Sequence, residues 1–240
     1  MTSERDGQAW IQELVAAIVA WGIEGAPIPH PLGGESFHLR TAAQMAQEYR
    51  LRAEGIGLER AIEELIEDQA RWNAGTGFLT GLGGFGLLPL QLPAAVTATW
   101  VIQTRLVATI AALHGLDLTH EAVRTQILLT LLGDEAREVL KQFGVKLSQR
   151  IAQAQLRRLP AVALEAINRA VGFRLVSRFG QQGVVNLHQA IPVLGGLVGG
   201  GIDYVMTRKL GEFAASELGR RGNAAAAAAS AEVIDVEVIS

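Results

Sequence analysis

The chain has 240 residues, which is long enough to bury a full hydrophobic core as one large domain or two small ones. Hydrophobic residues make up 49% and charged residues only 19%, a balance typical of a very apolar soluble protein or of one that contacts lipid. The absence of cysteine excludes disulfides and thiolate metal sites, and the N-terminus lacks the pattern of a signal peptide. We therefore expect a cytoplasmic, bacterial-type protein that could sit at the inner face of the plasma membrane.

The net charge of −3 conceals a separation of charge along the chain. Acidic residues outnumber basic ones over residues 1–73, whereas residues 141–178 are basic and contain Glu165 as their single acid. Such a segment can attach to anionic lipid, to nucleic acid or to the protein's own acidic half, or it can be a solvated helical face. Nucleic acid is disfavoured because interleaved aromatic residues are missing. The candidate lipid contacts are Lys146, Arg150, Arg157 and Arg158.

Two helices and a loop are predicted near the N-terminus. Apolar residues recur at helical spacing in the first helix, and Gly22 and Gly25 are expected to end it. Residues 27–34 are rich in proline and glycine, which favours a loop. The pattern Thr41-x-x-Gln44 then predicts a capping box at the start of the second helix.

A third helix is predicted over residues 58–73. Its apolar stripe consists of Ala61, Ile62, Leu65, Ile66 and Gln69. It leads into a run from Trp72 to Thr104 that contains no formal charge, with glycines in its first half and Pro89 and Pro93 in its middle. A further helix over 94–113 follows the two prolines.

Four more helices are predicted downstream. They cover residues 119–133, capped by Thr119 or Asp117, then 134–158, 160–179 and 192–218. A second run without charge extends from Phe179 to Ile202. After an alanine-rich linker, the apolar tail over 232–239 either adds as a strand to a sheet edge or stays frayed.

Neither uncharged run has the character of a simple membrane span. Pro89 interrupts the first run, and Arg105 lies in the helix that follows, where an arginine costs about 2.5–3.5 kcal/mol on insertion scales. Glycines spaced four apart allow close helix packing, at Gly77/Gly81, Gly195/Gly199 and Gly196/Gly200. We therefore predict one all-α, multi-helix domain whose core is a glycine-rich apolar helical hairpin packed against the second run. Insertion of the hairpin in lipid is the alternative.

Several short blocks follow one another in a distinctive order. They are Thr76–Gly84, Leu88-Pro89, Leu92-Pro93, Gln103-x-Arg105-Leu106, Ile110–Leu118, Ile191–Asp203 and Gly211 with Ala214-Ala215. In this order they resemble the EcsC protein family, over roughly residues 58–215. The resemblance divides the chain into an N-terminal region (1–57), an EcsC-like helical core (58–220) and an alanine-rich linker with a flexible tail (221–240). It implies a bacterial protein of a family named after a protein encoded beside an ABC transporter, and it implies no catalytic residues.

The sequence contains no convincing catalytic, metal or cofactor motif. His30, Glu35 and His38 lie in a loop without the spacing of a metal site, and His114 and His120 near a helix junction are interpreted as capping residues. No serine stands in a G-x-S-x-G motif, and no glycine-rich run has the lysine of a phosphate-binding loop. We therefore predict no catalytic residue, no metal and no cofactor.

Three polar residues inside apolar segments are the main binding candidates: Gln103, Arg105 and Asp203. A buried, unpaired charge is expensive, so we predict that Arg105 and Asp203 form an ion pair across the packed glycine-rich helices. We expect a non-enzymatic, peripheral membrane-associated or transporter-accessory protein that binds anionic lipid or a membrane transporter. The alternative is a soluble enzyme or small-molecule-binding protein with a pocket near Arg105, His114 and Asp203.

Overall fold

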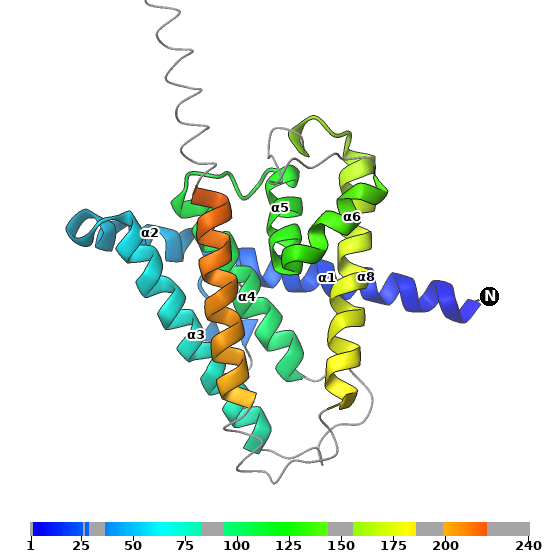
Figure 1. Ribbon diagram of the computed structural model, residues 1–240, viewed down its shortest axis with the longest axis horizontal. Helices are drawn as coiled ribbons and strands as arrows, with labels where there is room; N and C mark the ends of the chain where they lie inside the picture. The colour runs from blue at the N-terminus through cyan, green and yellow to red at the C-terminus, as the bar shows by residue number, and fades with distance from the viewer. Residues whose placement is uncertain are drawn as a thin grey trace, which may run out of the picture.

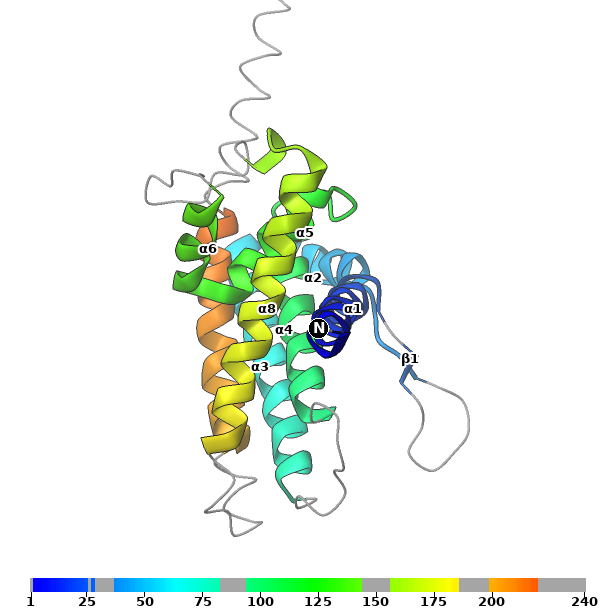
Figure 2. The same ribbon diagram turned by 90° about the vertical axis from the view of Figure 1, so that its right-hand side faces the viewer.

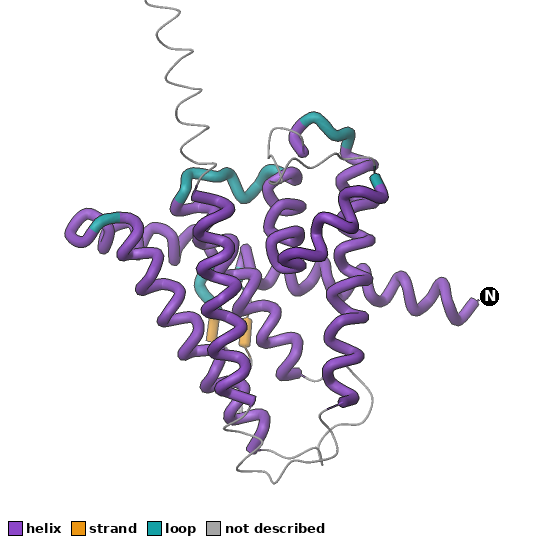
Figure 3. The backbone as a smooth tube through the Cα atoms, viewed as in Figure 1, coloured by secondary structure: helices purple, strands orange, loops and turns teal. Residues whose placement is uncertain are grey.

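The computed structural model describes residues 2–25, 27–28, 37–82, 94–143, 156–185 and 199–219. In chain order the elements are α1 (Thr2–Glu24), β1 (Pro27–Ile28), β2 (Phe37–His38), α2 (Ala42–Ile56), α3 (Leu58–Leu82), α4 (Ala94–Leu113), α5 (Glu121–Leu132), η2 (Gly133–Glu135), α6 (Ala136–Gln142) and α8 (Ala161–Val185). A further helix covers residues 199–219. The predicted all-α fold is confirmed, since the strands form only a two-residue antiparallel pair, β1 with β2, at one side of the helices (Figures 1, 2 and 3).

Helix α4 occupies the centre of the molecule. It contacts α1, α2, α3 and α5, and the 199–219 helix also packs on it (Figures 1 and 2). Every side chain over residues 99–111 is buried. Most of these side chains are apolar, and a helix with apolar residues on all its faces would leave apolar surface in water if any face were exposed. The mostly apolar character of this segment, in which Arg105 is the single formal charge, therefore agrees with its central position.

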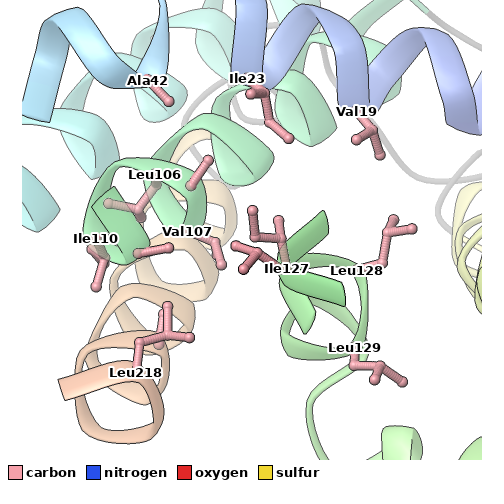
Figure 4. Packing of buried hydrophobic residues seen from close by; sticks show 14 of the residues in the cluster. Val19, Ile23, Ala42, Leu106, Val107, Ile110, Ile127, Leu128, Leu129 and Leu218 are labelled. Carbon is pink, nitrogen blue, oxygen red and sulfur yellow. The ribbon is translucent and has the colours of Figure 1, made fainter. Parts of the chain in front are cut away.

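The hydrophobic core joins the N-terminal helices to the rest of the chain. Figure 4 shows residues from α1, α2, α4, α5 and the 199–219 helix converging, among them Val19, Ala42, Ile110, Ile127 and Leu218. Burial of each large aliphatic side chain contributes roughly 1.5–3 kcal/mol. Residues on both sides of position 57 thus share one hydrophobic cluster.

Helices α3, α4 and the 199–219 helix form a three-helix arrangement. Helices α3 and α4 run antiparallel, and the 199–219 helix lies against both, with Gly211 close to Ile66 of α3 and Leu106 of α4. The predicted helical hairpin is therefore present. The side chains of residues 179–198, most of the second uncharged run, lie outside those described, so the packing of that run on the hairpin stays a prediction. The glycine pairs singled out above fall at least partly outside the residues whose side chains are described. None of the described helices is both long and apolar enough to span a membrane.

Local signals at the helix ends were partly right. The capping box of α2 is confirmed, with the Gln44 backbone N–H donating to Thr41 Oγ1 at 3.0 Å and the Thr41 N–H donating to Gln44 Oε1 at 2.9 Å. Neither Thr119 nor Asp117 is the N-cap of α5, because the N-cap is His120, whose Nδ1 accepts from the Ala122 N–H at 3.2 Å. The interpretation of His120 as a capping residue is therefore confirmed. An imidazole nitrogen can take the place of a hydroxyl or carboxylate oxygen in this role.

Helix lengths differ from the predictions at several places. Helix α1 continues through Gly22 to Glu24, α3 continues past residue 73 to Leu82, and α8 continues past residue 179 to Val185. The described part of the predicted 134–158 helix is shorter, because α6 ends at Gln142. The predicted strand over 232–239 lies outside the described residues.

Candidate functional site

A cavity of about 340 Å³ opens between α2, α3, α4 and the extended segment before α2. It is lined by His38, Leu39, Arg40, Met45, Glu48, Tyr49, Arg52, Asp68, Gln69, Trp72 and Arg105. Its size falls within the range of small-molecule sites. Arg105 is the cavity's single residue from the central helix.

Two glycines of α1 bring the extended segment over Arg105. At Gly22 a Cβ would lie 2.6 Å from Thr104 Cβ and 3.2 Å from the backbone nitrogen of Arg105, so only glycine lets α1 cross α4 here. Gly25 has φ +80°, and a Cβ on it would lie 2.2 Å from the carbonyl oxygen of Leu39. A left-handed residue with no side chain is therefore required where the chain leaves α1. These two positions set the distance between the 37–40 segment and α4.

Arg105 is a buried cation with a single neutral partner. Its side chain is 5% exposed, and its Nη2 donates to Gln69 Oε1 at 3.0 Å. Its Nε has no hydrogen-bond partner, and among the described residues no carboxylate forms an ion pair with it. Burial lowers the pKa of Arg105, and the positive charge of Arg40 lowers it further. Both effects show that the charged form lacks compensation from the protein.

The charged side chains at the cavity mouth are paired with one another. Glu48 forms ion pairs with Arg40 and with Arg52, the second at 2.6 Å. Arg52 also lies 3.6 Å from Asp68 Oδ2. Glu48 and Asp68 are thus engaged by other arginines and form no ion pair with Arg105. Among the described residues that line the cavity, the buried guanidinium therefore has no counter-ion.

Tyr49 forms a fixed wall of the cavity. Its hydroxyl donates to Asp68 Oδ2 at 2.5 Å, and the guanidinium carbon of Arg52 lies 4.5 Å from its ring centroid. Burial and the hydrogen bond to Asp68 raise the pKa of Tyr49 well above its ordinary value. Tyr49 therefore stays protonated, and its ring is held by a hydrogen bond at one end and a cation–π contact on its face.

The arrangement suits an anion. A guanidinium offers planar, bidentate donors that match a carboxylate or a phosphate, and it is less strongly hydrated than an ammonium group. Arg40 adds a second positive charge facing the same space. Among the described residues, no group of three His, Asp or Glu side chains could hold a metal ion.

The sequence model of the EcsC protein family matches residues 38–221. The chain belongs to the EcsC protein family. Neither a curated protein nor a solved structure matches it. The matched region begins at the extended segment and includes every residue that lines the Arg105 cavity.

The EcsC-family protein does not form the predicted ion pair between Arg105 and Asp203. Arg105 faces α3 and bonds to Gln69, whereas Asp203 lies on the 199–219 helix and pairs with no described cation. Burial alone raises the pKa of Asp203 to about 6. The error arose because spacing along a helix identifies a buried face but not the helix that covers it.

Gln103 and His114 belong to other surroundings. Gln103 Nε2 donates to Thr207 Oγ1 at 3.4 Å, within a polar network between α3, α4 and the 199–219 helix. His114, next to Gly219 at the far end of α4, is half-buried, and burial lowers its pKa. The pocket predicted near Arg105 is present, but neither His114 nor Asp203 lines it.

The basic segment of this EcsC-family protein is described only in part. Lys146 and Arg150 lie outside the described residues, and Arg157 and Arg158 are exposed. Other bases of the segment bind nearby acids, in the pairs Lys141–Glu138, Arg169–Glu165 and Arg174–Glu135. Much of the described positive charge is therefore neutralised locally.

Residues of α2 and α3 complete the site and were not identified as binding candidates. Gln69 is 7% exposed and was visible in the sequence as the one polar member of an apolar stripe. Arg40 and Tyr49 carry no such signal, because only the turn after α1 and the crossing of α2 bring them to Arg105.

Proposed function

We propose that this EcsC-family protein is a non-enzymatic binding protein that holds an anionic group, a phosphate or a carboxylate, against the guanidinium of Arg105. The observation that supports it is a buried arginine whose only side-chain hydrogen bond within the described part of the chain goes to a neutral amide. The site is open to a cavity, so a ligand can reach the charge.

The energetics favour an external anion. A buried charge deprived of its counter-ion typically costs 3–5 kcal/mol, and the fold here supplies no counter-ion from the described residues. An anion in the cavity beside the guanidinium would compensate its charge and offset the repulsion from Arg40. The favourable binding energy would come from supplying the counter-ion that Arg105 lacks. The position of this uncompensated charge therefore identifies the site.

The anion has two chemically equivalent sources, a membrane lipid headgroup and a free small molecule. Attachment at the inner face of the membrane, beside lipid or a membrane transporter, agrees with exposed apolar residues around the α2–α3 turn, where Leu51 is 62% exposed and Ile56 and Leu58 follow. This turn stands at the outer end of the molecule, and the same two helices line the cavity (Figure 1). A free anion agrees with the cavity's volume.

The first test measures binding of inorganic phosphate and of acetate by calorimetry. The wild-type protein should bind at least one of them, and Arg105→Met should weaken that binding tenfold or more. Arg105→Lys keeps the charge but loses the bidentate fork, so it should retain part of the affinity. Arg60→Met is the matched control, because Arg60 is an exposed arginine outside the cavity. Equal affinity in the wild type and Arg105→Met would refute the proposal.

The second test separates the two sources. The protein is sedimented with phosphatidylcholine vesicles, with and without phosphatidylglycerol, at two salt concentrations. Recruitment by anionic vesicles that Arg105→Met abolishes would assign the anion to a lipid headgroup. Binding of free anions without recruitment would assign it to a soluble molecule. Recruitment unchanged by Arg105→Met would place membrane contact on another surface and would contradict the headgroup assignment.

A further inference from the structure

An anion on Arg105 would fill only a small part of the cavity. Its volume of about 340 Å³ equals that of roughly ten water molecules at about 30 Å³ each. A phosphate or carboxylate group displaces only a few of these. The remaining space is therefore available to the rest of an organic ligand.

Beyond Arg105, the lining combines charged side chains with the apolar side chains of Leu39, Met45 and Trp72 and the ring of Tyr49. Met45 and Tyr49 are buried at 6% and 4% exposure, and Trp72 is 58% exposed. Trp72 follows Gln69, the partner of Arg105, by three residues on α3, so it lies on the same side of the helix one turn further along. The cavity thus combines the buried charge of Arg105 with an exposed aromatic ring at Trp72.

The mouth offers no further uncompensated charge. Glu48 is engaged by Arg40 and Arg52, and Asp68 accepts from Tyr49 and lies beside Arg52. A second charge on the ligand would find its potential counter-ions already paired. The chemistry of the cavity therefore selects a single anionic head on an uncharged apolar body.

We propose that the ligand is an amphiphilic organic anion, with its head on Arg105 and an acyl chain or aryl ring lying along Met45 and Tyr49 and leaving past Trp72. This inference rests on the proposed function, because Arg105 is the anchor in both. It adds the apolar body and the direction in which that body lies. The ligand volume corresponds to on the order of ten to fifteen heavy atoms.

The experiment uses the full chain and a series of straight-chain carboxylates from acetate to decanoate. Affinity should rise about threefold to fourfold with each methylene that is buried, until the chain passes the mouth and the gain stops. Octanol, which has the chain without the anion, should bind at least tenfold more weakly than octanoate. Trp72→Ala should reduce the gain in affinity with chain length, because the chain loses the ring that it lies against at the mouth. Trp21→Ala is the matched control, since Trp21 is 42% exposed and lies outside the cavity.

The outcomes separate this inference from the proposed function. If phosphate or acetate binds through Arg105 but affinity does not change with chain length, the amphiphile is refuted and anion binding stands. If no anion binds, both fail. If octanoate binds equally well to Arg105→Met, the contact is apolar adsorption and the anchoring role is refuted. Vesicles that contain oleate then separate the two sources of the ligand. Recruitment of the protein to these vesicles that octanoate reverses indicates an amphiphile held in a membrane. Octanoate binding without recruitment of the protein indicates a free amphiphile, and either result supports the inference.

Discussion

Two buried polar sites lie two residues apart on α4 and differ in how far their polar groups are paired within the protein. Around Gln103, the described polar groups satisfy one another: Asn73 Nδ2 donates to Thr207 Oγ1 at 2.8 Å, and Thr99 Oγ1 donates to Asn73 Oδ1 at 3.1 Å. Around Arg105, a charged group has one neutral partner and a donor left over. The first site contains neutral groups only and joins three helices. The second contains a net charge and opens to a cavity.

The difference separates a structural role from a binding role. Buried polar groups that complete one another fix how helices pack, because any other arrangement would leave them unsatisfied. A charged group that the protein leaves incomplete needs a partner from outside. The side-chain amide of Gln126 is also buried without hydrogen-bond partners, at 1% exposure. It is neutral, so leaving it unpaired costs less than leaving a charge unpaired, and it lines none of the described cavities, so a ligand cannot reach it there.

The largest expected effect comes from breaking the complete site. Asn73→Ala should lower the free energy of unfolding by about 2–4 kcal/mol, because it creates a small void, removes the acceptor of the buried Thr99 hydroxyl and leaves Thr207 with only the bond from Gln103. Chemical denaturation measures the loss. Gln47→Ala, an exposed amide on α2, should change stability by less than about 0.5 kcal/mol. Similar losses for both variants would show that the network is not what joins the three helices.

The second effect depends on pH and concerns Asp203, which lies one turn before Thr207. Burial raises the pKa of Asp203 to about 6 from its ordinary value of 3.8. Below pH 3.8 the carboxyl is protonated in both folded and unfolded chains. As the pH rises from about 3.8 to about 6, the unfolded chain ionises first, so stability falls, and above about 6 the loss stays constant. Asp203 is only partly buried, so solvent screening reduces the loss below the full value of the shift, to about 1 kcal/mol.

Asp203→Asn tests this dependence, because it removes the titration and keeps the shape. The variant should be more stable than the wild type at pH 7.5 and should lose that advantage near pH 4, as measured by urea unfolding at both values. Asp134→Asn, at an exposed aspartate, is the control and should leave the wild-type profile unchanged. Parallel profiles for Asp203→Asn and the wild type would place the carboxylate in contact with solvent.

A third effect tests the close packing that holds the complete site together. A Cβ at Gly211 would lie 2.7 Å from Ile66 Cγ1 and 3.2 Å from Leu106 Cδ2, so Gly211→Ala should lower stability by about 1–3 kcal/mol. Gly201, in the same helix, has no atom within 4 Å of such a Cβ. Gly201→Ala should therefore raise stability by up to about 1 kcal/mol through helix propensity. Thermal unfolding of the two variants should show shifts of opposite sign, and shifts of the same sign would contradict the packing.

Much of the fold could be predicted from periodicity, but the partners of its polar residues could not. The mostly apolar helix over 94–113 was predicted to belong to the core, and Arg105 stands out as the first charge after the uncharged run ends at Thr104. Whether Arg105 then meets Asp203 or Gln69 depends on how α3 and the 199–219 helix cross α4. That crossing is set by side-chain contacts far apart in the sequence, such as Gly211 against Ile66. Helical spacing carries no information about it.

Glycine positions show the same limit. Gly22 was expected to end a helix, because glycine is a common terminator, yet it lies inside α1 and lets that helix cross α4. The residue type alone cannot distinguish a helix end from a close contact. Arg40 and Tyr49 reach the cavity only as a consequence of that contact and of the turn at Gly25. The sequence could therefore predict Arg105 as a binding residue but could not predict that Arg40 and Tyr49 line the same cavity.

The smallest expected effect is the most informative, because its sign depends on whether a ligand is present. Without an anion, Arg105→Met should raise the free energy of unfolding by about 1–2 kcal/mol, since a desolvated charge is replaced by an apolar chain of similar length and only Gln69 loses a donor. With an anion at one hundred times its Kd, the wild type should gain about 2.7 kcal/mol and the variant none. The order of stability should then reverse. Denaturation of both proteins with and without the anion measures this, and Arg60→Met should track the wild type throughout. If Arg105→Met is the less stable protein without any anion, the guanidinium is already satisfied within the fold, and the distinction between the two sites on α4 disappears.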